Sequence, residues 1–458
     1  MSSDAPPSVR RSSMTLSASF SRLKELRTTD TGRAAELAAA SMLNNAIQLV
    51  FVVVLTRLLG KDGYASLAAL VAAFLILQVS GQSMQAAAAR AMVRWTRSGH
   101  HAPYREVAAW TRQVLLLSGV VLVLGVVLRA PLAQLIGVDE HRGAAALLPV
   151  TGTLWLLVCL QRGALQGLRD FDAVATSIVL EAVFRLGGAL LFVGLGPLVW
   201  ADTEVTGAFA AAPAAFALLA IGMDRRLRHA HLGDGEAEAA GDKPVPLRQL
   251  AQWELTVIVS LLLLAIMQNV DTILANREFE KAVAASYAAA AVAAKAVVWV
   301  AVGVALHLLP EATHRAVRGQ DPHPVLRRAL AFLALIGLPA IAIFAVIPGW
   351  LLTTAFGPEF DTASGALPLL GIAMLLLSIT LMSVQYLSAI GRHRHLLPLF
   401  VLAAVEIGLL LRKDWSATEF AGIVLAAQAV AAATTLTMAW FTKPAPGVDE
   451  RTAAEAVA

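Results

Sequence analysis

Twelve long apolar stretches constrain the fold of this 458-residue chain more than any other sequence feature. A helix needs about 20 apolar residues to cross the roughly 30 Å of hydrocarbon in a bilayer. The twelve expected spans are Ala38–Leu59, Tyr64–Ala86, Val107–Leu128, Ala144–Ala164, Ala173–Leu195, Val205–Gly222, Leu250–Ala275, Ala282–Leu309, Ala329–Pro348, Ala366–Ile390, Leu396–Leu411 and Ala417–Phe441. The eleventh is short and carries Glu406. Because no stretch alternates in the way a membrane strand does, we expect an all-α polytopic membrane protein.

The composition agrees with a membrane protein and excludes several other classes. Hydrophobic residues make up 58% of the chain and charged residues 15%, whereas a soluble domain carries about 25% charged residues. Cys159 is the single cysteine, which excludes a disulfide framework and a cysteine-based metal cluster. The net charge of +4 is too small to indicate a nucleic-acid partner.

Positive charges are distributed unevenly between the two sides of the predicted spans. One side holds 25 Lys and Arg residues, with Arg162 counted among its loops, and the other side holds 8. The remaining three, Arg112, Arg185 and Lys295, lie further inside spans, whereas Arg57 and Arg162, near span ends, are counted with the loops. Since loops rich in Lys and Arg stay in the cytoplasm, we expect a multi-pass protein of the plasma (inner) membrane with both termini cytoplasmic.

A polar segment with two prolines divides the twelve spans into two sets of six. The expected organisation is a cytoplasmic tail over 1–37, an N-lobe over 38–223, a linker over 224–249, a C-lobe over 250–441 and a cytoplasmic tail over 442–458. In the first tail, Leu16, Phe20 and Leu23 recur at helical spacing. This spacing indicates either an amphipathic helix on the membrane surface or a solvated tail.

The two halves also repeat one another weakly. Three matched pairs, each 220 to 223 residues apart, are Tyr64 and Tyr287, Gly137 and Gly357, and Arg169 and Arg392. Their constant offset favours a duplicated six-helix unit. Because each unit has an even number of spans, both halves have the same orientation, and we expect a cavity at their interface.

Short motifs then provide a family resemblance over roughly residues 38–441. They are Thr56-Arg57-Leu58-Leu59-Gly60 followed by Tyr64, Leu165-Gln166-Gly167-Leu168-Arg169, Glu181 with Arg185, Val270-Asp271-Thr272-Ile273-Leu274, Phe356-Gly357-Pro358 and Ala389-Ile390-Gly391-Arg392. In this order they resemble the polysaccharide flippases of the multidrug/oligosaccharidyl-lipid/polysaccharide (MOP) exporter superfamily. The resemblance implies a V-shaped, two-lobed transporter that moves polyprenyl-pyrophosphate-linked oligosaccharides to the outer leaflet. The short, charged eleventh span departs from the family pattern.

Ionisable residues inside spans are costly and are therefore candidate site residues. At about 1.5 Å per residue, Arg185 and Lys295 both lie about 18–20 Å deep, one in each half. Two cations facing a shared cavity would bind a pyrophosphate. Alternatively, Arg185 merely neutralises Glu181, four residues earlier on the same helix face. Lys295 has no acidic neighbour on its own span, and Asp271 on the preceding span is roughly 13 Å away in depth.

The remaining candidates are one carboxylate and two rows of polar side chains. Glu406 takes up a coupling proton if burial disfavours its charge, or it pairs with Arg185 or Lys295. The rows consist of Ser41, Asn44 and Gln48 on the first span and Gln78, Gln82 and Gln85 on the second. Such rows either join helices together or line a sugar-binding cavity.

The sequence contains no pattern that indicates catalysis. It has no GxxxxGK[ST] loop and no HExxH motif, so we expect neither an enzyme nor a nucleotide, metal or other cofactor. His393 and His395 are expected to be solvated loop residues. We therefore expect a flippase for surface polysaccharides such as lipopolysaccharide, with lipid-linked oligosaccharide, the bilayer and polysaccharide assembly enzymes as partners. The alternatives are a drug–cation antiporter of the same fold and a membrane glycan polymerase or ligase.

Overall fold

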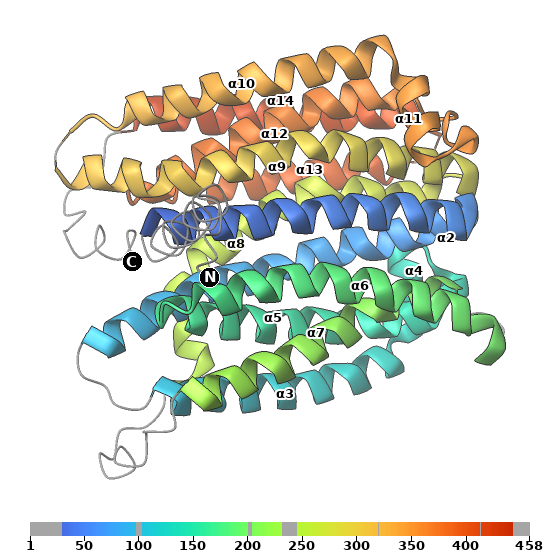
Figure 1. The fold of residues 1–458 in the computed structure, drawn as a ribbon. Helices are drawn as coiled ribbons and strands as arrows, with labels where there is room; N and C mark the ends of the chain where they lie inside the picture. The colour runs from blue at the N-terminus through green and yellow to red at the C-terminus, as the bar shows by residue number, and fades with distance from the viewer. Residues whose placement is uncertain are drawn as a thin grey trace, which may run out of the picture.

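The computed structural model describes residues 30–97, 103–199, 204–230, 245–318, 320–412 and 414–442. The possible amphipathic helix, most of the linker and the C-terminal tail lie outside these residues. Within them the chain forms α-helices and short 3-10 turns, with no strand. The long helices run roughly parallel to one common direction (Figure 1).

The first half of the chain contributes six α-helices and one short turn. They are α2 (Asp30–Arg97), α3 (Pro103–Val127), α4 (Arg129–Ile136), η1 (Asp139–His141), α5 (Arg142–Gly167), α6 (Phe171–Val199) and α7 (Glu204–Ala230). The second half contributes α8 (Leu247–Glu278), α9 (Lys281–Val317), α10 (His323–Val346), α11 (Pro348–Phe356), η3 (Pro358–Phe360), α12 (Ala366–Ala389), α13 (Leu396–Leu410) and α14 (Ala417–Phe441).

These helices confirm the prediction of twelve spans. Ten helices of the described chain are long and apolar enough to cross a membrane. The first, α2, contains two predicted spans joined at Gly60, whose φ of 62° and ψ of −172° are not helical. The eleventh span is α13, whose 15 residues reach only about 22 Å.

Two hydrophobic cores, each built mainly from one half of the chain, define two lobes. Residues of α2, α5 and α7 form much of the N-lobe core, including the packed rings of Phe74, Trp155 and Phe216. Residues of α9, α12 and α14 form much of the C-lobe core. In Figure 1 the first part of α2 and helix α8 lie between the two groups of helices. The all-α, two-lobed fold class is therefore confirmed.

Matching helix ends in the two lobes show the repeat in detail. The turn after α5 closes with Asp170 N–H donating to the Leu165 carbonyl and Arg169 N–H to that of Gln166. After α12, Arg392 and Gly391 donate in the same register to Leu387 and Ser388. Both turns are Schellman motifs, which place one residue in the left-handed region. Those residues are Arg169, with a φ of 63°, and Gly391, with a φ of 72°. Arg169 therefore matches Gly391, and the sequence pairing of Arg169 with Arg392 is wrong by one residue.

Candidate functional site

A charged cluster in the N-lobe joins α5 to α6. The Glu181 carboxylate lies between two arginines, with Arg162 Nη1 at 2.9 Å from Oε2 and Arg185 Nη1 at 3.6 Å from Oε1. Arg162 also donates to the Ser177 hydroxyl at 2.8 Å and to the Ser177 carbonyl at 2.9 Å. One carboxylate and two guanidinium groups leave this cluster, the N-lobe triad of Arg162, Glu181 and Arg185, with a net charge of +1.

Arg162 was assigned to a cytoplasmic loop on sequence, and that assignment is wrong. Helix α5 continues to Gly167, so Arg162 lies inside the helix with 4% of its surface exposed. No spacing rule links Arg162 to Glu181, because the two residues meet only through the packing of α5 on α6. Since Arg162 is the closer partner of Glu181, the carboxylate does not neutralise Arg185 alone.

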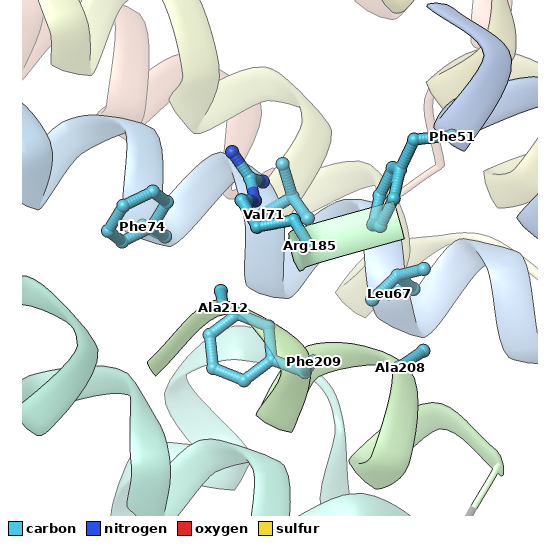
Figure 2. A pocket seen from close by; sticks show the side chains of 8 residues that line it. All are labelled: Phe51, Leu67, Val71, Phe74, Arg185, Ala208, Phe209 and Ala212. Carbon is cyan, nitrogen blue, oxygen red and sulfur yellow. The ribbon is translucent and has the colours of Figure 1, made fainter. Parts of the chain in front are cut away.

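Arg185 lines a small cavity between α6, α7 and the two parts of α2. Figure 2 shows its side chain between Phe51 on one side and Val71 and Phe74 on the other. The guanidinium carbon lies 5.6 Å from the centre of the Phe51 ring, a cation–π distance. Its Nε has no hydrogen-bond partner among the described residues. The cavity volume of about 10 Å³ admits about one water, so a head group requires Phe51 and its helix to move.

The C-lobe holds a different polar cluster, between α8 and α9. Lys295 Nζ donates to Asn269 Oδ1 at 3.0 Å and lies 3.5 Å from Thr272 Oγ1. The Asp271 carboxylate accepts from the Tyr287 hydroxyl at 3.1 Å and from Thr272 Oγ1 at 3.3 Å. All five side chains are buried. We name these five residues the C-lobe cluster.

The depth expected for Lys295 explains why its partners were missed. Its Cα lies eight residues, or about 12 Å, further along α9 than that of Tyr287. However, helical side chains tilt toward the N-terminus of their helix, which brings the ammonium group back to Asn269 and Thr272. Lys295 therefore binds Asn269 and Thr272, which lie close to Asp271 in the sequence. The role of Lys295 in binding a head group stays a prediction.

Glu406 is completely buried on α13 and forms no ion pair with the residues that the structure describes. Neither of its carboxyl oxygens accepts a hydrogen bond from the described residues. Gln428 of α14 and Asp271 are its polar neighbours. The Gln428 Nε2 donates to the Met267 carbonyl at 2.9 Å, which leaves the Gln428 Oε1 unpartnered. Glu406 and Gln428 therefore both keep unpartnered oxygens in the interior of the C-lobe.

The amide side chains of the first two spans are partly accessible. Gln82 is exposed, whereas Gln78, Asn44 and Gln48 are half-buried. The apolar neighbours of Asn44 on α2 are also open, with Met42 74% and Leu43 49% exposed. Neither row is therefore sealed inside a helix–helix contact in this conformation.

The lobes meet at the end of the bundle opposite the start of α2. Tyr64 of the N-lobe packs on Phe356 and Phe360 of the C-lobe, with ring centres 6.5 and 5.8 Å apart. Lys281 Nζ lies 3.3 Å from Ser66 Oγ. Asn276 Nδ2 donates to the Gly137 carbonyl at 2.9 Å. We name these contacts the lobe closure.

Gly137 makes part of the lobe closure possible. Its φ of +77° suits glycine, and an added Cβ would lie 2.8 Å from Arg277 Cα. Any larger residue would therefore push α4 away from the end of α8. The tight backbone approach explains why a glycine follows α4.

At the other end of the bundle, α8 is attached to the N-lobe. Glu254 of α8 forms an ion pair with Arg90 of α2. Just before α8, the Val245 N–H donates to Glu106 at 2.7 Å and its carbonyl accepts from Trp110 at 2.9 Å. Helix α8 thus begins in the N-lobe and ends in the C-lobe, so a change in the angle between the lobes must be transmitted through it.

His395 was expected to be solvated, and that expectation is wrong. It is fully buried at the start of α13, where its Nε2 lies 3.0 Å from the Ser260 hydroxyl of α8. Burial, with the neighbouring His393, lowers the pKa of His395 to about 4. The ring therefore stays neutral at physiological pH and links α13 to α8.

Comparisons with known proteins identify the family and the fold. The family model described as "Polysaccharide biosynthesis protein" matches residues 34–310, more than half of the chain. Among curated protein sequences, none matches this chain.

Solved structures match over most of the chain at low sequence identity. A multidrug resistance MATE family transporter of the MOP superfamily in an inward-facing conformation is 15% identical, with a TM-score of 0.71 over 89% of this chain and 97% of that one. An outward-facing MATE family transporter is 14% identical, with a TM-score of 0.60 over 91% and 97%. A MOP superfamily transporter from Pyrococcus furiosus is 14% identical, with a TM-score of 0.57 over 91% and 97%. At this identity the matches establish the fold alone, and they agree with the expected superfamily. The chain is thus a multi-pass membrane protein of the polysaccharide biosynthesis protein family, with the two-lobed fold of the MOP exporters.

Proposed function

We propose that this protein is a secondary transporter of the cell membrane that moves polyprenyl-pyrophosphate-linked oligosaccharides to the outer leaflet by alternating access. The observation that carries the proposal is the net positive N-lobe triad, with Arg185 beside the hinge-like α2. Glu181 already has Arg162 as its partner, so Arg185 retains hydrogen-bonding capacity for an anion. A pyrophosphate supplies the matching charge.

Helix α2 supplies the movement that this binding needs. Phe51 and Arg185 are in contact, and Phe51 lies on the part of α2 before the Gly60 break. Displacing that part opens the cavity next to Arg185. The amides of Asn44, Gln48, Gln78 and Gln82 then face the sugars, while the lipid tail stays in the bilayer.

The lobe closure supports an alternating-access cycle. It joins the lobes at the end of the bundle opposite the start of α2, and the charge distribution assigns this end to the outside. A head group then enters from the cytoplasmic side, and separation of Tyr64 from Phe356 and Phe360 releases it outward. Uptake and loss of a proton at Glu406 is the proposed coupling step.

The charge of the site weighs against the two alternatives. A drug–cation antiporter needs negative charge in its cavity, whereas Glu181, Asp271 and Glu406 are all buried. Pocket polarity has been tied to function in the Pyrococcus furiosus MOP transporter. A polymerase or ligase needs a catalytic domain, and the described connections at the lobe closure, such as 137–141 and 357–365, are short.

Gene deletion followed by complementation tests this function in cells. A flippase performs no covalent chemistry, so its loss should reduce surface polysaccharide while complete lipid-linked precursor accumulates on the cytoplasmic leaflet. The wild-type gene should restore the polysaccharide, whereas Arg185→Gln should not. Single repeat units that still reach the outer face would instead indicate a polymerase or ligase. Retention of toxic cations with normal glycans would indicate a drug exporter.

A further inference from the structure

Helices α3 and α7 lie on the side of the N-lobe away from the C-lobe (Figure 1). Residues of both helices line a surface groove. Its volume is about 380 Å³, and its lining includes Tyr104, Thr111, Arg112, Leu116, Asp224 and Arg228. Leu115, also in the groove, and Leu116 are 50% and 64% exposed. The groove therefore combines a polar end with an apolar end on a surface that a bilayer would cover.

The polar end carries one uncompensated positive charge. Arg228 is neutralised by Asp224, with Nη2 at 2.8 Å from Oδ2, and its guanidinium carbon lies 6.0 Å from the Tyr104 ring centre. Arg112 is exposed and has no ion pair or hydrogen bond within the described part of the chain. The buried Thr111 hydroxyl beside it also has no partner there. A free, exposed guanidinium suits an anion with several oxygens.

The position of Arg112 selects the kind of anion. It lies within the apolar segment Tyr104–Val127, about 12 Å from Tyr104 along the helix. Helical side chains tilt toward the N-terminus, so the guanidinium reaches back toward the membrane–water boundary at the start of α3. At that boundary a bilayer presents lipid phosphates, and the exposed Leu115 and Leu116 continue the groove toward its apolar interior.

We propose that this groove binds an anionic phospholipid. The exposed Arg112 guanidinium contacts the phosphate, while Leu115 and Leu116 contact an acyl chain. The Asp224–Arg228 pair forms the far wall and is electrically neutral. This site lies on a different face from the N-lobe triad and does not depend on which substrate is transported.

Lipid titration of the purified full-length protein in detergent, followed by native mass spectrometry, tests the proposal. The probes are dioleoyl-phosphatidylglycerol and dioleoyl-phosphatidylcholine, which share acyl chains but differ in net charge. Phosphatidylglycerol should bind more tightly, and Arg112→Gln should weaken it about tenfold through loss of a charge-assisted hydrogen bond. Arg327→Gln, at an exposed arginine of α10, is the matched control and should bind like the wild type.

Further measurements test the role of Arg112 and separate the possible sources of phosphate. Arg112→Lys keeps the charge and should retain binding within a few-fold, which distinguishes recognition from misfolding. Equal binding of both phospholipids, or equal losses in Arg112→Gln and Arg327→Gln, would overturn the proposal. Displacement by millimolar inorganic phosphate would indicate a soluble-anion site instead. Tighter binding of undecaprenyl phosphate than of phosphatidylglycerol would assign the groove to the transported lipid.

Discussion

The two lobes share a fold but use their buried charges differently. In the N-lobe, two arginines compete for Glu181, and Arg185 keeps a free Nε beside a movable helix. In the C-lobe, Lys295 is bound by Asn269 and Thr272, and Asp271 is bound by Tyr287. The lobes thus keep matching helices and turns, while Arg185 keeps free hydrogen-bonding capacity in one lobe and Lys295 and Asp271 are paired internally in the other. The N-lobe is the better candidate for anion recognition, and the C-lobe for coupling.

The largest effect is expected for Glu181→Gln, which tests whether the N-lobe depends on this carboxylate. The change leaves two buried arginines without a counter-charge, and breaking a buried pair costs about 3–5 kcal/mol. Folded protein should fall sharply in detergent size-exclusion profiles. Glu204→Gln, at the exposed start of α7, should leave the profile unchanged. A normal yield of Glu181→Gln would show that the triad is not the main electrostatic link between α5 and α6.

Arg185→Gln should separate transport from folding. It leaves the neutral pair of Arg162 and Glu181 intact, so the yield and melting temperature should remain near those of the wild type. Lipid-linked oligosaccharide transport should fall about 10- to 100-fold, the equivalent of one or two charge-assisted hydrogen bonds. Unchanged transport would remove Arg185 from the binding site.

His395 predicts a pH effect confined to the C-lobe and its contact with α8. Burial lowers the folded-state pKa to about 4, whereas the unfolded value is about 6.5. The unfolded state therefore binds more protons between these values, and stability falls as the pH drops from about 6.5 to 4. At pH 5 the loss should be about 2 kcal/mol, visible as a lower melting temperature in detergent. His395→Gln should flatten this slope, whereas His229→Gln, at an exposed histidine on α7, should not.

The smallest effect is expected for Lys295→Met, which tests whether the C-lobe cluster is internally satisfied. Methionine keeps much of the side-chain volume but leaves Asn269 without its ammonium donor, which costs about 1–3 kcal/mol. The melting temperature should fall while transport per folded molecule stays within a few-fold. Loss of transport at normal stability would instead make Lys295 a head-group residue, as the sequence alone suggests.

The sequence predicts the fold well because lipid imposes length and polarity on each span separately. Twelve apolar stretches, including the separation of the first two between Leu59 and Tyr64, were readable without tertiary information. The duplicated turns were found to within one residue, since both Arg169 and Gly391 occupy the same left-handed position. The short α13 was also expected, because its apolar run is short in the sequence.

The site was only partly predictable because it depends on packing between helices. Glu181 and Arg185 share a helix and were paired by spacing, whereas Arg162 joins them from α5. The depth estimated from residue numbers placed Lys295 far from Asp271 of α8. That estimate did not include the direction of the Lys295 side chain, which reaches Asn269 and Thr272 of α8. In the sequence His395 follows the basic loop residues His393 and Arg394. Only its burial and its contact with Ser260 distinguish it from a solvated histidine.

Transport by purified protein in sealed proteoliposomes tests the central claim most directly. A lipid-pyrophosphate oligosaccharide placed in one leaflet should appear in the other without ATP, and its glycan should keep its length. Arg185→Gln, reconstituted at equal density, should slow this movement about 10- to 100-fold, while Glu204→Gln should not. Movement that requires nucleotide, elongation of the glycan, or equal rates for Arg185→Gln and the wild type would contradict the account.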